Sequence, residues 1–328
     1  MKEIRLGTIG SGPIVRSILD HVNKIDGIRL AAVYSRNEDT GRELAAGYDV
    51  SKVYTDMDAF LEDEDINFVY IASPNLLHYP QAKKALLAGK HVILEKPFCT
   101  KREHAGELVG IAKAKNLFLI DAVPTTFLPN FDILCRELPK IGKVKGVLAN
   151  YSQYSSRYDA LVRGELPNVF NPAYGGGCLM DINFYNVYLN VVLFGKPKTA
   201  LYHPNMYHDL IDVSGTVVMT YDDFISESIG AKDADGTSFF QIEGEDGSIH
   251  IHQGSNGLAK IAVVKNGTEE LFDRQEKGDR WFYEMQAVTD LVLADDYDAI
   301  YQRLDIMLDV VEVLETARIK AGILFSGD

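Results

Sequence analysis

The sequence is poor in cysteine and has no long apolar run. Its three cysteines, Cys99, Cys135 and Cys178, lie far apart and form no C-x-x-C pair, which argues against a disulfide framework or a zinc site and favours a reducing compartment. The first residues, MKEIRLGTIGSG, carry no apolar segment of a secretory signal. No uncharged apolar run approaches the length of a membrane span. We therefore expect a cytoplasmic protein without a membrane partner.

Positive charge is also scarce. The chain has 33 Lys and Arg residues against 47 Asp and Glu residues, a formal net charge of −14. Binding to a nucleic-acid backbone needs a clustered basic surface, so this balance argues against nucleic acid and suits small-molecule chemistry. The remaining composition is typical of a globular protein, with 46% hydrophobic residues in a chain of 328, which is long enough for two domains.

The histidines do not form a metal-binding pattern. The spacing of His203 and His208 fits no common site, and His250 and His252 would share one strand face without a carboxylate or thiol nearby in the sequence. We therefore expect no bound metal.

The first residues predict a strand, a glycine turn and a helix, in the order typical of a dinucleotide site. An apolar strand over Ile4–Ile9 leads into Gly10, which would allow a tight turn, and Gly12, which would let backbone amides approach a pyrophosphate at the helix N-terminus. Pro13 suits a first helical position, whereas Val15 leaves the G-x-G-x-x-G/A fingerprint incomplete. The residues expected at the cofactor here are Gly10, Ser11, Gly12, Pro13 and Ile14.

The end of the next predicted strand, Leu30–Tyr34, bears on the choice of coenzyme. A site for NAD usually has Asp or Glu there to bind the ribose 2′-hydroxyl. This chain has Ser35 and Arg36 instead, a hydroxyl and a guanidinium that could bind a 2′-phosphate. We therefore expect NADP, with NAD as the alternative and a surface role for Arg36 as the simpler explanation.

Strands and helices continue to alternate up to residue 122. This alternation predicts an α/β Rossmann domain, a doubly wound parallel sheet, over residues 1–122. Predicted strands at Phe68–Ala72, Val92–Leu94 and Phe118–Ile120 would end at the sheet edge where open α/β folds bind ligands. The residues expected at the cofactor along this edge are Ala72, Ser73, Pro74, Asn75, His78, Glu95, Lys96, Pro97 and Asp121.

Lys96 is the residue of this edge best suited to chemistry. A lysine that is partly desolvated in a crevice can have its pKa lowered toward neutrality and exchange protons. The alternative is an ordinary solvated lysine at the end of a strand.

The second half of the sequence, residues 123–328, follows a different pattern. Short strand-like segments between Val144 and Val264 are joined by turn signals such as Asp235-Gly236 and Asn266-Gly267. They predict an α+β domain with a large, mostly antiparallel open sheet. Predicted helices cover Gly177–Phe194, Trp281–Ala294 and Leu304–Ala321, and the last one could pack back on the first domain.

The helix predicted after three glycines carries a second candidate site. The run Gly175-Gly176-Gly177 would let the backbone approach a partner closely, and we expect the nicotinamide end of a cofactor there. Asp181 and Tyr185 are four residues apart and would share one helix face. An acid and a phenol one turn apart could position and protonate a substrate oxygen. The alternative is that both side chains are structural.

Together these motifs resemble the glucose–fructose oxidoreductase / inositol dehydrogenase / rhizopine-catabolism (Gfo/Idh/MocA) family. The likeness runs from Gly7 to the C-terminus and rests on the glycine turn, the Glu95-Lys96-Pro97 tripeptide, the segment GGGCLMDINFY and the closing helix VVEVLETARIKAG. The resemblance implies a Rossmann domain followed by an α+β domain whose open sheet forms a subunit interface, and hence a homodimer or homotetramer.

The resemblance also implies roles for three side chains. Lys96 matches the catalytic or substrate-orienting lysine, and Asp181 matches the aspartate that contacts the substrate. Tyr185 stands where most members have a histidine, as in glucose–fructose oxidoreductase and the dimeric dihydrodiol dehydrogenases, where the tyrosine is taken as the proton donor and acceptor. Tyrosine has an unperturbed pKa of about 10, so a neighbouring cation, here Lys96, would have to assist proton release.

One segment departs from the dihydrodiol dehydrogenase pattern. Asp121, Pro124 and Thr126 stand where that pattern has glutamate, tryptophan and arginine. The changes remove an aromatic wall and a cation, so the dihydrodiol substrate itself does not transfer to this chain.

The leading hypothesis is an NADP(H)-dependent oxidoreductase that moves a hydride between nicotinamide and a secondary alcohol or carbonyl of a small molecule: a sugar, polyol or cyclic diol. Tyr185 and Lys96 would move the hydroxyl proton while Asp181 holds the substrate. One alternative is a non-catalytic cofactor-binding sensor of the same fold. Another is an enzyme whose tightly held cofactor cycles between two sugars.

Overall fold

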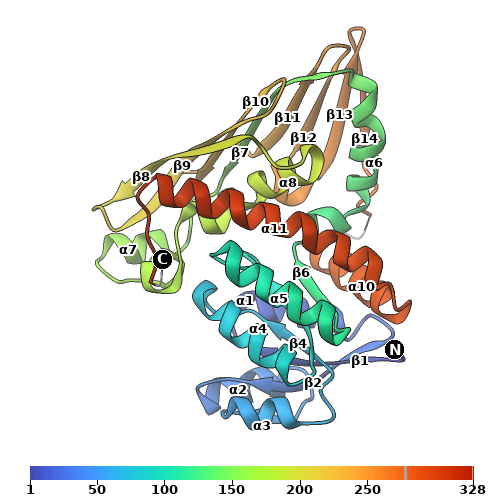
Figure 1. Cartoon of the computed structure of the whole chain (residues 1–328), viewed down its shortest axis with the longest axis vertical. Coiled ribbons are helices and arrows are strands. Elements are labelled where there is room, and N and C mark those ends of the chain that lie inside the picture. Colours follow the sequence, from blue (N-terminus) through green and yellow to red (C-terminus); the bar gives the residue numbers. More distant parts are fainter. Residues whose placement is uncertain (277–278, 327) are drawn as a thin grey trace. The chain divides into compact units, whose positions relative to one another are not determined.

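The computed structural model describes residues 1–276, 279–326 and 328, and the chain divides into two compact units (Figure 1). The first unit combines Met1–Val123 with Trp281–Leu308, and the second combines Pro124–Arg280 with Asp309–Asp328. Each unit therefore contains a segment from the C-terminal part of the sequence.

The first unit is built on a parallel sheet. Its described strands lie in the order β3-β2-β1-β4-β5-β6, and every neighbouring pair is parallel. This is the order of a dinucleotide-binding Rossmann sheet, in which the direction of winding reverses between β1 and β4. The prediction of a doubly wound parallel sheet is confirmed. The strands are β1 (Ile4–Ile9), β2 (Ile28–Tyr34), β3 (Val53–Tyr54), β4 (Phe68–Ile71), β5 (His91–Glu95) and β6 (Leu119–Ala122).

Helices connect these strands and bury one apolar face each. In α1, for example, Val15, Ile18, Leu19 and Val22 are buried, at the spacing of one helix face. Asn37 and Asp56 cap the helices that follow by accepting hydrogen bonds from the amides of Thr40 and Ala59. These helices are α1 (Pro13–Val22), α2 (Glu38–Ala46), α3 (Met57–Glu62), the 3-10 turn η1 (Asn75–Leu77), α4 (His78–Leu87) and α5 (Arg102–Lys115). After β14 the chain forms α10 (Arg280–Leu293) and α11 (Tyr297–Lys320), and α11 belongs to the first unit up to Leu308 and to the second unit from Asp309.

The second unit contains a larger sheet. Its described strands lie in the order β14-β13-β12-β11-β7-β10-β9-β8, and all neighbouring pairs are antiparallel except β7 and β10. The predicted large, mostly antiparallel sheet is confirmed. The strands are β7 (Val144–Ser152), β8 (Thr199–Tyr207), β9 (Ile211–Thr220), β10 (Ile225–Ala231), β11 (Phe239–Gly244), β12 (Ser248–His252), β13 (Lys260–Lys265) and β14 (Thr268–Phe272).

Sequence reasoning missed β14. The strand is short and mostly exposed, so it has no apolar alternation. It pairs with β13 through a hairpin whose turn residues, Asn266 and Gly267, both have positive φ. Tight two-residue hairpin turns require this conformation, and Asn-Gly is a preferred sequence for them.

A buried helix covers one face of this sheet. The apolar helix α8 (Phe184–Phe194) packs on β7 and β10 (Figure 1). The helix predicted over Gly177–Phe194 is present from Cys178 onward, and its part Leu179–Asn183 forms a π-helix, η6, before α8 begins. The other helices of this unit are η2 (Pro124–Phe127), α6 (Pro129–Glu137), η3 (Leu138–Ile141), α7 (Tyr158–Val162), η4 (Asn168–Phe170), η5 (Pro172–Tyr174) and α9 (Gly254–Gly257).

Among the helices of the described residues, none combines the length and apolar character needed to cross a membrane.

A histidine in the first unit links stability to pH. His91 opens β5 and stacks on Phe68 at a ring-centroid distance of 4.7 Å, and its ring contacts the tilted ring of Phe118 at 5.2 Å. The amide of Phe118 donates to His91 Nδ1 at 2.9 Å, so that nitrogen is unprotonated. Burial lowers the pKa of His91 to about 4, which means that the folded state keeps the ring neutral where the unfolded chain would protonate it.

We therefore expect the free energy of unfolding to fall as the pH drops from about 6.5 toward 4, because the unfolded state binds more protons there. The contribution of His91 is about 3 kcal/mol at most, from the linkage of pKa to free energy. In His91→Asn, denaturant titrations at pH 7 and pH 4.5 should differ by less than in the wild type. The exposed His203→Asn is the control; an unchanged pH dependence in His91→Asn would contradict the assignment.

Candidate active site

The glycine turn after β1 lies at the switch point of the first unit's sheet. Gly10 has φ +116°, and a Cβ on it would lie 2.8 Å from the carbonyl oxygen of Ala72 at the end of β4, so only glycine fits. A Cβ on Gly12 would meet no protein atom within 4 Å among the described residues. Pro13 opens α1, and no described side chain caps its first turn. The amides at this helix N-terminus therefore suit an anionic group such as a pyrophosphate.

The two residues expected to determine coenzyme preference, Ser35 and Arg36, follow β2 and differ in exposure. The Ser35 side chain is buried, and its Oγ accepts a hydrogen bond from the amide of Asn37 at 3.3 Å. It also packs close to Gly41. Arg36 is exposed. Arg36 is therefore the better placed of the two to meet a 2′-phosphate.

His78 is buried, and it joins two turns of the sheet edge. Its Nε2 lies 2.8 Å from the carbonyl oxygen of Ser73, after β4, and its Nδ1 lies 2.9 Å from that of Pro97, after β5. Burial lowers the pKa of His78 to about 4, and a neutral ring has one N–H to donate. His78 thus lies beneath the turns that the sequence placed at the cofactor, where it supports their backbone.

Glu95 and Lys96 are fixed by the same turn. Glu95 is 5% exposed; it accepts a hydrogen bond from the Tyr70 hydroxyl at 2.6 Å and one from the amide of Lys96 at 3.1 Å. The peptide bond between Lys96 and Pro97 is cis. Glu95 is therefore an internal brace for the lysine's backbone, whereas the Lys96 side chain is partly exposed.

Asp121, the last residue expected along this edge, has a partner that motif reasoning did not find. Arg303 of α11 binds both of its carboxylate oxygens, at 3.2 and 2.9 Å. Asp121 is 2% exposed, and such a bidentate pair fixes both side chains. Nothing in the sequence near either residue signals a contact across 182 positions.

In the second unit, the three glycines approach the protein's own atoms. A Cβ on Gly176 would lie 2.6 Å from the carbonyl oxygen of Val169, and one on Gly177, which has φ +113°, would lie 2.1 Å from Asp212 Oδ1. The close approach that we expected to serve the nicotinamide is thus used within the fold, to bring this segment against Asp212.

Asp181 and Tyr185 follow the glycine run in the sequence. Asp181 lies in the π-helix η6, and Tyr185 is the second residue of α8. Single π-helical turns occur frequently at functional sites. Tyr185 is 4% exposed, and its ring lies 5.9 Å from that of Tyr151. The carboxylate of Asp181 is bound by the ammonium of Lys232, a residue that the sequence did not single out.

A ladder of buried amides holds the helix that carries Tyr185. Asn183, Asn186 and Asn190 are all 0% exposed. The amide group of Asn183 donates to the carbonyl oxygen of Ser228 at 2.9 Å, and that of Asn186 donates to the carbonyl oxygen of Ile229 at 2.9 Å. Both acceptors are backbone atoms of β10, so the ladder fixes the rotation of α8 on the sheet.

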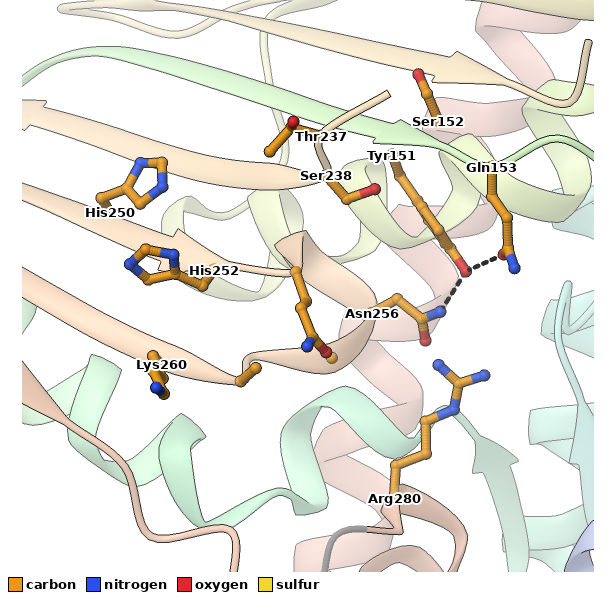
Figure 2. A pocket seen from close by; sticks show the side chains of 13 residues that line it. Tyr151, Ser152, Gln153, Thr237, Ser238, His250, His252, Asn256, Lys260 and Arg280 are labelled. Atoms are coloured by element: carbon orange, nitrogen blue, oxygen red, sulfur yellow. Dashed lines mark hydrogen bonds between the residues drawn. The ribbon is translucent and has the colours of Figure 1, made fainter. Parts of the chain in front are cut away.

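A cavity of about 710 Å³ in the second unit adjoins this helix (Figure 2). In it, the Tyr151 hydroxyl accepts a hydrogen bond from Asn256 Nδ2 at 2.5 Å and donates one to Gln153 Oε1 at 3.3 Å. Asn256 is 4% exposed, and within the described residues its Oδ1 has no hydrogen-bond partner. The lining residues are Tyr151, Ser152, Gln153, Thr237, Ser238, His250, His252, Gln253, Asn256, Gly257, Ala259, Lys260 and Arg280.

The cavity is polar and carries no negative charge. None of the described residues that line it is Asp or Glu, although the chain as a whole has a net charge of −14. Figure 2 shows Arg280 directed toward Asn256. Tyr151, which lines the cavity, packs its ring against that of Tyr185 at a centroid distance of 5.9 Å. In the described part of the chain, no group of three or more His, Cys, Asp or Glu side chains could hold a metal ion.

We expect Asn186→Leu to destabilise the protein by about 3 kcal/mol. The substitution removes the hydrogen bond to the carbonyl oxygen of Ile229. It also leaves two buried partners of Asn186 unsatisfied, namely Asn183 Oδ1 and the Ser255 hydroxyl. Denaturant unfolding measures the change. Asn205→Leu is the matched control, since Asn205 is exposed and bonds only to the Ser214 hydroxyl. Equal effects of the two substitutions would show that the ladder does not hold α8.

Comparison with known proteins agrees with the fold and the motifs. The family described as "Oxidoreductase family, NAD-binding Rossmann fold" (GFO_IDH_MocA) matches residues 4–121. The chain is 34% identical to scyllo-inositol 2-dehydrogenase (NADP(+)) IolU of Bacillus subtilis (strain 168), with 99% of each chain covered. It is 26% identical to D-xylose 1-dehydrogenase (NADP(+)) of Hypocrea jecorina, over 81% of this chain and 73% of that one.

Among solved structures, the fold matches KijD10, a 3-ketoreductase from Actinomadura kijaniata in complex with NADP and TDP-benzene. The TM-score is 0.85 at 20% sequence identity, with 97% of this chain and 98% of that chain covered. The resemblance predicted from the E-K-P tripeptide and the glycine-led helix is thus confirmed, and the chain belongs to the Gfo/Idh/MocA family of oxidoreductases.

Proposed function

We propose that this protein is an NADP-dependent dehydrogenase that transfers a hydride between nicotinamide and a secondary alcohol or carbonyl of a sugar or polyol. The names of two relatives, a scyllo-inositol dehydrogenase and a xylose dehydrogenase that both use NADP(+), support this class. Membership of an oxidoreductase family favours a catalytic role over that of a cofactor-binding sensor.

The observation that carries the substrate class is the cavity that Tyr151 lines. Hydroxyl and amide side chains line it, and Asn256 Oδ1 is a buried acceptor that lacks a donor among the described residues. Leaving a buried acceptor unsatisfied costs about 1–3 kcal/mol, which a ligand hydroxyl would recover. A molecule with several hydroxyl groups suits such a lining, whereas the flat hydrocarbon ring of a cyclic diol suits it less.

The first unit would hold the cofactor. The amides of the turn from Gly10 to Ile14 suit the pyrophosphate, because Gly12 leaves room in front of the N-terminus of α1. Arg36 would pair with the 2′-phosphate, and the turns after β4 and β5, fixed by His78, would border the cofactor. When bound, nicotinamide supplies the hydride acceptor or donor.

The proton would move at Tyr185. In the oxidation direction the ionised Tyr185, as phenolate, would take the substrate hydroxyl proton, and in reduction the neutral phenol would donate one to the carbonyl oxygen. Lys96 would be the cation that assists this release, and Asp181 would accept a hydrogen bond from a substrate hydroxyl. These three roles are proposals from the family resemblance.

The test is an assay of the purified protein with NADP⁺ against a panel of inositols, aldoses and polyols, followed by nicotinamide absorbance. We expect turnover of at least one alcohol, and a loss of about 10²-fold or more in kcat from Lys96→Ala and from Tyr185→Phe, since proton transfer by a positioned group contributes that much. Lys143→Ala, an exposed lysine paired with Asp223, is the control.

The same assay tests the coenzyme. NADP⁺ should have the higher kcat/KM, and Arg36→Leu should narrow the gap to NAD⁺ by removing the charge that pairs with the 2′-phosphate. A clear preference of the wild type for NAD⁺ would contradict the assignment of Arg36. Full activity in both Lys96→Ala and Tyr185→Phe would contradict the catalytic roles.

We also propose a cytoplasmic location. Cys99, Cys135 and Cys178 are all free thiols, as expected in a reducing compartment.

The open face of the second unit's sheet supports the proposal of a homodimer or homotetramer. The strand register places five large apolar side chains on that one face, and each is between 45% and 61% exposed. Apolar side chains gathered on a surface in this way mark association sites. They are Leu148, Leu201, Ile225, Ile229 and Leu271.

We expect the protein to run as a dimer or tetramer by light scattering after gel filtration, and Ile229→Lys to shift it toward the monomer by placing a charge at the centre of the buried face. Leu87→Lys is the control, because Leu87 is 53% exposed on α4 of the first unit. A wild-type monomer at micromolar concentration would rule out the proposed assembly.

A further inference from the structure

Lys232 places a buried positive charge beside the proposed substrate-binding carboxylate. Its side chain is 5% exposed, and its ammonium binds Asp181 Oδ2, while the Asp181 side chain is 28% exposed. The ammonium also lies 5.4 Å from the ring centroid of Phe170, which is fully buried. Lysine is almost never buried unless its charge is compensated, so this position needs an explanation.

The backbone of Lys232 is held from both sides. Its amide donates to the carbonyl oxygen of Val213 at 2.8 Å, and its own carbonyl oxygen accepts from the amide of Ser155 at 2.8 Å. Lys232 directly follows β10, the strand on which α8 is anchored. The ammonium and the helix start that carries Asp181 are thus fixed to the same strand.

Further acids lie in the same region as this pair. The carboxylates of Asp181, Asp212 and Asp233 and the ammonium of Lys232 all act on the thiol of Cys178. Asp212 is 1% exposed and accepts hydrogen bonds from the amide of Leu179 at 2.7 Å and the Tyr202 hydroxyl at 2.8 Å. Without the ammonium, the carboxylate of Asp181 would lose its opposite charge in a region that holds other acids, which disfavours its charged form.

We propose that Lys232 is a positioning residue for the reaction: it keeps Asp181 ionised and holds that carboxylate at the start of α8, one turn before Tyr185. The inference rests on the proposed function, in which Asp181 meets the substrate. A carboxylate bound to an ammonium is a weak base and a good hydrogen-bond acceptor. Asp181 therefore orients a substrate hydroxyl and does not take its proton, which leaves proton transfer to Tyr185.

A double-mutant cycle tests the inference. Lys232→Met should lower kcat/KM for the alcohol by about 10²-fold, the size of a loss from misplacing a substrate-positioning group, with the dissociation constant of NADPH unchanged within about twofold. Asp181→Asn should lower kcat/KM to a similar extent. The double variant should be no worse than Asp181→Asn alone, because Lys232 acts only through Asp181. Losses that multiply in the double variant would overturn the proposal.

Melting temperatures supply the second readout. Lys232→Met leaves a carboxylate uncompensated, so it should melt below the double variant, in which both charges are absent. Lys143→Met, which breaks the exposed pair with Asp223, is the control and should change neither readout. If Lys232→Met does not fold, comparing Asp181→Asn with the double variant still tests the proposal. Equal kcat/KM values of these two variants support it, and a lower kcat/KM in the double variant contradicts it.

Failure of the proposed function gives a different pattern. If the wild type turns over no alcohol, that function is contradicted, whereas the melting temperatures still report whether Lys232 and Asp181 are coupled. If the wild type is active and Asp181→Asn is equally active, Asp181 does not meet the substrate, and the role of Lys232 as a positioning residue is contradicted with it.

Discussion

The second unit depends on the docking of one helix by buried amides. Asn183, Asn186 and Asn190 occupy one face of the segment that carries the proposed proton donor, and their partners include backbone carbonyl groups of β10 and of the helix itself. Hydrophobic packing alone would tolerate sliding or rotation of an apolar helix on a sheet, whereas hydrogen bonds to fixed carbonyl groups do not. Tyr185 is therefore positioned by the sheet, through the helix.

In the first unit, buried polar side chains likewise hold the backbone in place, here at single turns. His78 connects the carbonyl oxygens of Ser73 and Pro97, and Glu95 connects Tyr70 to the amide of Lys96. In each case a buried polar side chain braces a turn at the end of a parallel strand. Such turns carry function because they lie at the sheet edge. The polar braces add hydrogen bonds that fix the backbone of these turns.

Local patterns predicted the fold and part of the candidate site. The glycine turn, Pro13 and the alternation of strands and helices are encoded over short stretches, so they predicted the parallel sheet and the glycine turn that opens α1. The family likeness pointed to Lys96, Asp181 and Tyr185 for the same reason. Contacts between distant residues were not predictable, because one sequence carries no signal for them. Examples are Arg303 with Asp121 and Lys232 with Asp181.

The glycine run and His78 show that a sequence pattern does not reveal which atoms a residue will contact. A close backbone approach was correctly expected at Gly176 and Gly177, but a sequence does not say whether the atom approached belongs to a ligand or to the protein, and here it belongs to the protein. Similarly, the sequence made His78 a candidate cofactor contact, whereas in the structure its two ring nitrogens face the carbonyl oxygens of Ser73 and Pro97. Residue type predicts which chemistry is available, and only tertiary structure decides where it is used.

The charge of the chain also needs the structure to be interpreted. A net charge of −14 would by itself repel an anionic coenzyme. The acids expected at the site are compensated locally, however: Asp121 by Arg303, whose side chain is 19% exposed, and Asp181 by Lys232, whose side chain is 5% exposed. The cavity that Tyr151 lines has Lys260 and Arg280 and no carboxylate among its described lining residues. Because buried charges are screened much less than exposed ones, the ion pairs of Asp121 and Asp181 neutralise two acids whose negative charge would otherwise act strongly on the groups around them.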